Sequence, residues 1–256
     1  MDDDRYRAPA LDKGLDILEL LAEIDGGLTQ AEIAKSLNRT PNELYRMLDR
    51  LQKRGYVARI DGDRFALTLK MFGLAQLHAP TRRLVSYATP LMRELAGKTR
   101  QAVHLAVFDR GQVVVVAQQE APDYWGISVR VGSRISLFDT GSGHVMLAFN
   151  AQGRRQMMVS ENQVEGDGAI PVSLLERFSR IREQGYESMP SAQTAGVFNL
   201  SAPILAGDGN AIAALTVPYI PLVNAAGVPD MSDCTHFLVE TCQILSEMTG
   251  MRDNEK

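Results

Sequence analysis

The chain has 256 residues, of which 45% are hydrophobic and 23% charged. This length allows two ordinary domains, and the composition is typical of a globular protein with a sizeable core, which excludes a disordered chain, a collagen and a continuous coiled coil. The longest apolar runs, such as Val113–Ala117 and Ala211–Val217, are far shorter than the ~20 residues that cross a bilayer, so we expect no membrane partner.

The N-terminus and the cysteines indicate the compartment. Asp2, Asp3 and Asp4 stand where a secretory signal needs a basic start before an apolar segment, so we expect a cytoplasmic protein. Cys234 and Cys242 lie in a segment with helical character, and this pair suits neither a disulfide framework nor a four-cysteine metal site. Both thiols are expected to be reduced and structural.

Charge is unevenly distributed along the chain. The overall net charge of −4 gives no sign of a nucleic-acid partner, but between Thr29 and Lys70 nine basic residues stand against five acidic ones, a local charge of +4. Phosphate binding requires such clustering, although clusters of this size also occur on ordinary solvated surfaces.

The first elements are helical. Helical spacing begins at Leu11, and the first helix ends at Gly26-Gly27. Two capping boxes then mark two further helix starts: Thr29 with Glu32 predicts a short helix over 29–37, and Thr40 with Pro41 and Glu43 predicts a helix from Pro41 to Gly55. The apolar stripe of the first helix comprises Leu11, Leu15, Leu18 and Leu21. The inward side of the third comprises Leu44, Leu48 and Leu51, and its outer side comprises Asn42, Tyr45, Arg46, Asp49, Arg50 and Lys53.

Two short β-type runs, 56–60 and 64–68, follow around Asp61-Gly62-Asp63, which suits a hairpin turn. Three short helices and a hairpin predict an N-terminal, mostly α winged helix-turn-helix domain over residues 1–69. Its third helix has the length and polarity of one that enters a DNA major groove.

A linker and a second domain come next. Residues 70–84 are expected to form a helical linker, with a new helix from about Leu84 to Lys98, and residues 85–256 a second domain. Its β-type runs cover 102–109, 112–120, 127–131, 201–205 and 211–217, and its expected helices cover 143–149, 173–183 and 230–248. Hairpins with helices packed on them predict an α+β fold.

The motifs resemble those of a known family. From Ala10 the segments ALDKGLDILELLA, GGLTQAEIAKSLNRTPNELYRMLDRLQKRGYV and RFALTLKMFGLA resemble the N-terminal domain of the isocitrate lyase regulator (IclR) family of bacterial transcription factors. AVHLAVFD, VRVG, GSGHVMLAF, the pair Gly185-Tyr186, APIL and AIAALTV follow in the family's order, so the resemblance covers nearly the whole chain. It implies a GAF-like C-terminal domain that binds a small effector, and a homodimer or tetramer paired through the first helix and the linker.

The resemblance makes Pro41–Arg54 the recognition helix and Asp61-Gly62-Asp63 the tip of the wing, with double-stranded operator DNA as the partner. Side chains early in such a helix reach base edges, and the flanking cations suit phosphates. Glu43 stands where the family often has Ser or Thr near the DNA. Its carboxylate must serve the capping box or accept a hydrogen bond from a cytosine, and we favour the cap. The predicted DNA-binding residues are Arg39, Thr40, Asn42, Tyr45, Arg46, Arg50, Lys53, Arg59 and Arg64.

For the effector, the resemblance places a carboxylate near a small-residue turn that begins a helix, which in this chain is Gly141-Ser142-Gly143. Such a helix start offers backbone amides to an anion, and glycine permits close approach. The family's better-known pattern has an acid, a cysteine and two serines where this chain has Met189, Asn199, Thr216 and Pro218, so we expect a less polar pocket and a ligand other than glyoxylate or pyruvate. Trp125 is expected either at the cavity mouth or at a surface or interface. The predicted effector-binding residues are Trp125, Gly141, Ser142, Gly143, Met189, Asn199, Thr216 and Pro218.

Enzyme chemistry has no support in the sequence. No nucleophile elbow, phosphate-binding loop or metalloprotease motif occurs, so we expect no catalytic residues, no cofactor and no metal site. His104 lies within an expected strand and is interpreted as packed. The expected function is a ligand-responsive DNA-binding regulator that controls a catabolic operon in response to a small organic acid or an aromatic metabolite. The alternative is a ligand-binding module that acts through protein contacts, which would bind DNA weakly and without sequence preference.

Overall fold

The computed structural model of the protein describes residues 8–77, 79–123, 126–162, 170–221 and 227–250. The chain forms two compact units that meet between Ala79 and Pro80. None of the helices in the described part of the chain has the length and hydropathy needed to cross a bilayer.

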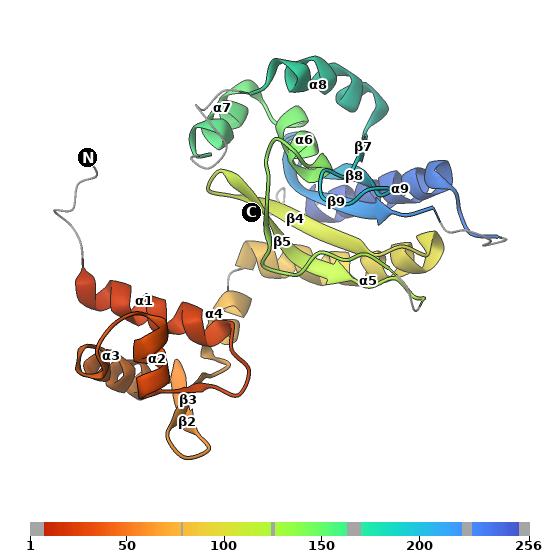
Figure 1. The fold of residues 1–256 in the computed structure, drawn as a ribbon. Helices are drawn as coiled ribbons and strands as arrows, with labels where there is room; N and C mark the ends of the chain where they lie inside the picture. Colours follow the sequence, from red (N-terminus) through yellow and green to blue (C-terminus); the bar gives the residue numbers. More distant parts are fainter. Residues whose placement is uncertain (1–7, 78, 124–125, 163–169, 222–226, 251–256) are drawn as a thin grey trace. The chain divides into compact units, whose positions relative to one another are not determined.

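The N-terminal unit combines helices with a small sheet (Figure 1). The strands are antiparallel, in the order β1-β3-β2, and the hairpin of β2 and β3 forms the wing. Its core gathers Ile17 and Leu21 from the first helix, Ile33 from the second, Leu44 from the third and Phe65 from the hairpin. The elements are α1 (Pro9–Ala22), β1 (Leu28–Thr29), α2 (Gln30–Ser36), α3 (Pro41–Lys53), β2 (Val57–Ile60), β3 (Arg64–Leu67) and α4 (Lys70–Leu77).

Both capping boxes predicted from the sequence are confirmed. The Glu32 carboxylate accepts hydrogen bonds from the Thr29 backbone N–H at 2.8 Å and from its hydroxyl at 3.0 Å. Glu43 accepts the same two bonds from Thr40, at 2.8 and 2.9 Å. Each carboxylate thus satisfies a backbone donor that the start of a helix leaves without a partner.

The predicted stripe of α1 is partly wrong. Leu11 and Leu15 are 61% and 45% exposed. The buried side of the helix comprises Gly14, Ile17, Leu18 and Leu21. The prediction followed leucines alone and omitted Ile17, whose inclusion rotates the buried face of the helix. The helix also ends at Ala22, before the glycine pair. The two-residue strand β1, which pairs with β3, is too short to leave a pattern in the sequence.

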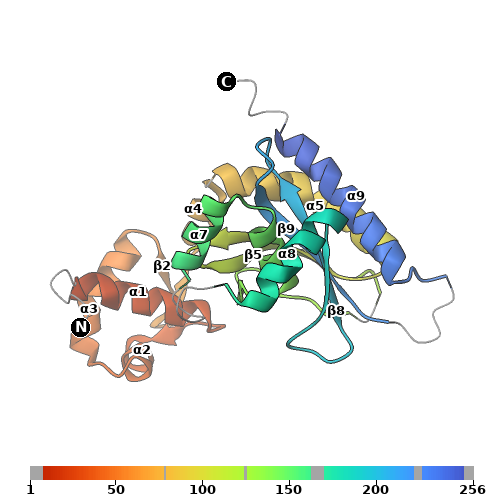
Figure 2. The same cartoon turned by 90° about the horizontal axis from the view of Figure 1, so that it is seen from above.

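The C-terminal unit is built on a six-stranded antiparallel sheet with the order β6-β5-β4-β9-β8-β7. Figures 1 and 2 show α5 and α9 together on one face of this sheet and α6, α7 and α8 on the other side. The strands are β4 (Val103–Asp109), β5 (Gln112–Gln119), β6 (Arg134–Ile135), β7 (Glu187–Pro190), β8 (Phe198–Leu205) and β9 (Ala211–Tyr219). The helices are α5 (Ala79–Thr99), α6 (Gly141–Ala148), α7 (Gln152–Ser160), α8 (Val172–Gln184) and α9 (Met231–Gly250).

Alternation along the strands separates two hydrophobic layers. Leu105 and Leu215 pack with α5 and α9, whereas Ala106 and Ala214, their neighbours in sequence, pack with α6 and α8. Successive strand residues point to opposite faces of a sheet, so each strand serves both layers.

Several predicted bounds in this unit are wrong. No strand forms over 127–131, and α5 begins at Ala79 rather than Leu84 and continues through Pro90. The elements β6, β7 and α7 were missed. Strands of two and four residues leave little pattern, and α7 is a polar helix that buries only Met158 and Val159.

The start of α6 lies very close to its neighbours. A Cβ atom on Gly143 would lie 2.2 Å from the carbonyl oxygen of Leu137, and one on Gly141 would lie 2.5 Å from the Ser201 hydroxyl oxygen. Both glycines are therefore needed for the packing of the protein against itself.

This close packing predicts opposite effects for two glycine substitutions. Gly143→Ala should lower the free energy of unfolding by about 1–3 kcal/mol, because the new methyl group meets backbone atoms that cannot move aside cheaply. Gly153→Ala in α7, where a Cβ atom meets nothing within 4 Å, should raise it by about 0.5–1 kcal/mol through helix propensity. Urea titration of both variants measures the two changes, and equal effects would contradict the proposed packing of α6.

Candidate DNA-binding helix and ligand pocket

The outer side of α3 presents the predicted polar residues. Asn42, Tyr45, Arg46, Arg50 and Lys53 are all exposed, and the Tyr45 side chain is 60% exposed. Their spacing of three or four residues places them along one side of the helix. The Lys53 ammonium lies 3.0 Å from the Asp49 carboxylate one turn earlier, but it remains largely in solvent.

Glu43 lies on the same helix but is engaged in the cap. Its two hydrogen bonds from Thr40, first the backbone and then the hydroxyl, hold the pKa of the Glu43 carboxyl below its usual value, and Lys13, 3.5 Å away, adds to this. The expectation that this carboxylate serves the capping box is confirmed. Its negative charge is thereby held at the positive end of the helix rather than extended toward a nucleic acid.

Two of the predicted phosphate contacts already have partners inside the unit. The Arg39 guanidinium lies 3.3 Å from the Asp16 carboxylate. Arg64 donates to the carbonyl oxygen of Gly27 at 2.8 Å and lies 3.4 Å from Glu32. These contacts give both arginines a structural role that a count of charges did not reveal.

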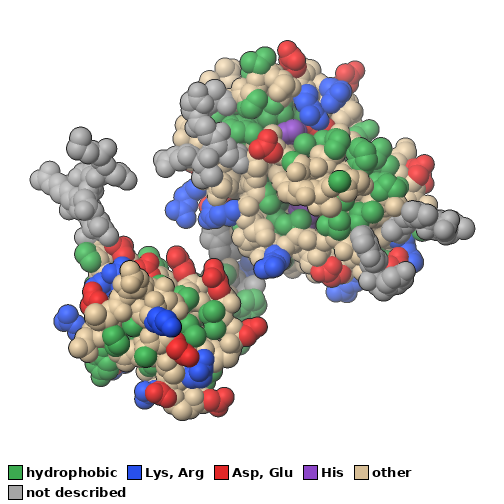
Figure 3. All heavy atoms as spheres, in the orientation of Figure 1, with side chains coloured by type: hydrophobic (Ala, Val, Ile, Leu, Met, Phe, Trp, Pro, Cys, Tyr) green, Lys and Arg blue, Asp and Glu red, His purple; other side chains and the backbone are tan. Residues whose placement is uncertain are grey.

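Positive charge does not form a uniform surface. On the face drawn in Figure 3, acidic and basic side chains are interspersed over the N-terminal unit. Arg59 on β2 is exposed, and its guanidinium carbon lies 5.5 Å from the centre of the Phe65 ring. Basic side chains therefore do not form one continuous patch on this face.

The C-terminal unit contains a row of buried polar residues across its sheet. The strand register pairs His104 of β4 with Thr216 of β9, Thr216 with Ser201 of β8, and Ser201 with Glu187 of β7. Directly paired residues on neighbouring strands point to the same face. All four are less than 5% exposed. The register thus places a polar row within an otherwise hydrophobic layer on the α6 side of the sheet.

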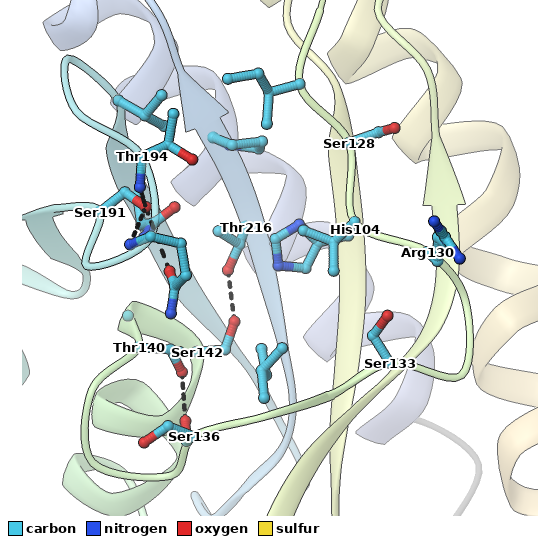
Figure 4. Close-up of a pocket in the computed structure, with 18 of the residues that line it drawn as sticks. His104, Ser128, Arg130, Ser133, Ser136, Thr140, Ser142, Ser191, Thr194 and Thr216 are labelled. Carbon is cyan, nitrogen blue, oxygen red and sulfur yellow. Dashed lines mark hydrogen bonds between the residues drawn. The ribbon is translucent and has the colours of Figure 1, made fainter.

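Hydroxyl groups connect this row to α6. The Thr216 hydroxyl oxygen lies 2.8 Å from that of Ser142 (Figure 4). It lies 2.7 Å from the hydroxyl oxygen of Ser201. The three hydroxyl groups carry three hydrogens, and the two bonds between them use two. One hydroxyl hydrogen of this group therefore has no partner in these two bonds.

A cavity of about 600 Å³ opens beside the row. Its walls are the start of α6, the loop residues 127–136 and the loop residues 191–197, and it lies within the size range of small-molecule sites. The predicted effector residues that line it are Gly141, Ser142, Asn199, Thr216 and Pro218.

Two predicted effector residues are described by the structure but are not part of the cavity lining. Gly143 packs against the backbone of Leu137 instead. Met189 lies on β7, directly across from Asn199 and one strand further from β4. Trp125 lies outside the described residues.

The start of α6 favours an anion at this cavity. Thr140 caps the helix by accepting from the Gly143 N–H at 3.2 Å. Within the described residues, the N–H groups of Gly141 and Ser142 donate no hydrogen bond, so they and the helix dipole remain available to a ligand. Arg130 adds a cation to the lining.

Beneath α6 lies a buried ion network. His144 lies 3.1 Å from the Glu187 carboxylate through Nδ1 and 2.6 Å from the Phe138 carbonyl oxygen through Nε2, so its ring can bond to both acceptors only as the imidazolium. Arg177 lies 2.9 Å from the other Glu187 oxygen. Burial alone would raise the pKa of Glu187, but the bond from His144 and the charge of Arg177 outweigh burial and hold that pKa below its usual value.

Sequence reasoning missed Ser201, Glu187 and Arg130, and it interpreted His104 as packed. These residues come together only through the strand register and two long loops. The spacing of alternate residues could have placed His104 and Ala106 on one face of β4, but nothing in the sequence identified the facing residues on β9 and β8.

Comparison with known proteins gives two family matches. Residues 78–224 match the family described as the bacterial transcriptional regulator IclR C-terminal domain, and residues 10–61 match the IclR helix-turn-helix domain. The HTH-type transcriptional regulator BhcR of Paracoccus denitrificans is 32% identical over 244 residues, which cover 93% of this chain and 86% of that protein. KdgR of Escherichia coli is 26% identical over 209 residues, 79% of each chain.

Solved structures show the same fold. IclR of Thermotoga maritima superposes with a TM-score of 0.75 at 20% identity and covers 94% of this chain and 98% of its own. An IclR homolog from Microbacterium hydrocarbonoxydans, complexed with 4-hydroxybenzoate, gives a TM-score of 0.73 at 21% identity and covers 93% and 97%. The predicted fold class, an N-terminal winged helix-turn-helix and a C-terminal α+β domain, is confirmed.

The ion network predicts a pH-dependent contribution to stability. Glu187→Gln should lower the free energy of unfolding at pH 7 by about 3–5 kcal/mol, because it breaks a buried ion pair. The folded-state pKa of Glu187 lies below the unfolded value of about 4.3, so this contribution is complete above that pH and is lost as the pH falls through the folded-state pKa. Urea titrations between pH 7 and pH 3 should show the gap to wild type narrowing. The exposed Glu183→Gln serves as a control with little effect, and a gap independent of pH would contradict the ionised network.

Proposed function

The chain belongs to the IclR family of bacterial transcriptional regulators, and we propose that it binds operator DNA through α3 and that a small carboxylate in the cavity beside α6 changes this binding. Its relatives are transcriptional regulators and not enzymes. The observation that carries the proposal is the pairing of an exposed polar α3 with a cavity whose floor offers free hydrogen-bond donors.

In the DNA-binding domain, residues 1–69, the first turns of α3 would enter the major groove. Asn42, Tyr45 and Arg46 would contact base edges, where amide and guanidinium groups can recognise individual bases. The remaining exposed groups would contact phosphates: Thr40, Arg50, Lys53 and Arg59. Arg39 and Arg64 would reach phosphates only by giving up their bonds within the domain.

The assembled regulator would be a homodimer or tetramer. Exposed apolar side chains on α1 and on the expected linker, residues 70–84, offer a surface for pairing two copies of the chain. A symmetric pair would fit an operator of two half-sites. The apolar side chains are Leu11, Leu15, Phe72, Leu74 and Leu77, each at least 45% exposed.

The effector would occupy the C-terminal domain, residues 85–256. Its carboxylate would accept from the N–H groups of Gly141 and Ser142, and its apolar body would lie against Val197 and Pro218. The cavity exceeds what a two- or three-carbon acid fills, and the 4-hydroxybenzoate complex of the solved homolog supports an aromatic acid. Coupling requires the effector to bind the two DNA-binding states with different affinity, typically by about 1–3 kcal/mol.

Arg46→Ala tests the DNA-binding helix. It should lower the ratio of specific to non-specific affinity by about tenfold or more, because a base-reading arginine contributes about 1–3 kcal/mol of discrimination. The measurement is binding to DNA from upstream of the protein's own gene and to an unrelated fragment of equal length, each titrated with salt.

The matched control is Arg93→Ala, which removes the same charge from the exposed side of α5. A ratio equal in the two variants would sink the assignment of α3. Weak, sequence-independent binding by the wild type, confirmed by selection from a random DNA library, would favour the module that acts through protein contacts.

Asn199→Trp tests the cavity. The Asn199 Cβ lies 3.6 Å from the position that a Cβ on Gly141 would take, so an indole here would cover the start of α6. The variant should bind 4-hydroxybenzoate and related acids at least tenfold more weakly than wild type, with unchanged affinity for DNA.

Calorimetric titration with a panel of small carboxylic acids provides the measurement. Ser188→Trp, on β7 in a different cavity, introduces the same side chain and should leave acid binding unchanged. If Asn199→Trp leaves acid binding unchanged, the effector site is not in this cavity.

A further inference from the structure

His104 differs from the other members of the polar row. Thr216 and Ser201 are bonded to each other, and Glu187 is bonded to His144. The Nδ1 atom of His104 is buried and has no hydrogen-bond partner within the described residues. A buried polar atom without a partner destabilises the folded protein, because it has lost its hydrogen bond to water.

The ring lies at the wall of the effector cavity. His104 is 4% exposed and lines the same cavity as Ser142 and Thr216. Figure 4 shows its ring beside Thr216, directed into the cavity from β4. Burial lowers the pKa of His104 to about 4, so at neutral pH the ring carries one N–H donor and one acceptor nitrogen.

The second buried histidine shows what a structural role looks like in this protein. Both ring nitrogens of His144 have acceptors within the protein, at Glu187 and Phe138. His104 has no comparable protein partner on Nδ1, although Thr216 is its direct neighbour across the strands. Nδ1 itself is shielded in this geometry, but the ring lines the cavity, so a bound molecule can hydrogen-bond to the imidazole once the ring turns about its Cβ–Cγ bond and brings a nitrogen to the cavity surface.

We propose that His104 is a specificity-determining residue of this cavity, and that it selects carboxylic acids which also carry a hydroxyl or carbonyl group over acids with a plain hydrocarbon body. This inference rests on the proposed effector function. The carboxylate would lie at the start of α6, and the second polar group would hydrogen-bond to the imidazole on β4. The cavity would thus recognise its ligand from two sides, the helix on one and the sheet on the other.

The test compares acids in matched pairs on three forms of the full-length protein. The probes are benzoate with 3- and 4-hydroxybenzoate, and butanoate with 2-oxobutanoate. The proteins are wild type, His104→Leu, which removes hydrogen bonding at similar volume, and His104→Asn, which replaces the imidazole by an amide that can donate and accept. Calorimetric titration measures each affinity.

Wild type should bind at least one hydroxy or oxo acid about tenfold more tightly than its parent acid, as expected for one added hydrogen bond. His104→Leu should remove this preference without weakening the parent acid, and His104→Asn should restore part of it. Wild type without preference, or a preference that survives His104→Leu, would overturn the role of His104.

Thermal unfolding without ligand provides a second measurement, which distinguishes a ligand-binding histidine from one with a structural role only. Because the Nδ1 atom has no partner to lose, His104→Leu should keep or raise the unfolding midpoint of the ligand-free protein. A midpoint lowered by several degrees would show that the ring stabilises the fold and would overturn the proposal.

The outcome also separates this inference from the proposed function. Acids that bind wild type and are excluded by Asn199→Trp, but show no preference for a second polar group, would overturn the role of His104 and leave the effector site in place. If no acid binds wild type, or if Asn199→Trp leaves acid binding unchanged, both the proposed effector site and the role of His104 are overturned.

Discussion

The arrangement of the C-terminal unit depends on the close packing of the start of α6 against its neighbours. Gly143 lies against the backbone of Leu137, Ser142 bonds to Thr216, and His144 bonds to the buried Glu187. These contacts anchor three consecutive residues at the start of one helix, whose first two residues, Gly141 and Ser142, line the cavity. A shift of α6 would therefore change the ion network and the lining of the cavity together, so the proposed coupling of ligand binding to the rest of the molecule would act through this helix.

In both units a carboxylate near a helix start is held by hydrogen bonds or ion pairs within the protein. Glu43 is held by Thr40 at the start of α3, so the exposed side of that helix presents Asn42, Tyr45 and Arg46 without a projecting carboxylate. Glu187 is held by His144 and Arg177, so the buried acid beneath α6 is paired inside the protein. In each unit an internal bond to a carboxylate removes a negative charge from the region where we propose an anionic partner, DNA phosphate in one and a ligand carboxylate in the other.

Local signals in the sequence predicted the elements better than the site. Capping residues, glycine stops and the Asp-Gly-Asp turn are short-range chemistry, and they located α2, α3 and the wing within a few residues. The buried side of α1 was misjudged because leucines were counted without Ile17. The row of His104, Thr216, Ser201 and Glu187 depends on a register between strands that are up to 112 residues apart in the chain, and no local pattern encodes it. The resemblance found five lining residues of the cavity, but not the histidine beside them.

The most direct measurement is a crystal structure of the protein with an acid that binds in the calorimetric screen. The ligand carboxylate should lie within hydrogen-bond distance of the Gly141 and Ser142 N–H groups, with the Ser142–Thr216–Ser201 hydroxyl chain beside it and the second polar group at His104. A ligand bound in another cavity, or bound here with its carboxylate directed away from α6, would contradict the account.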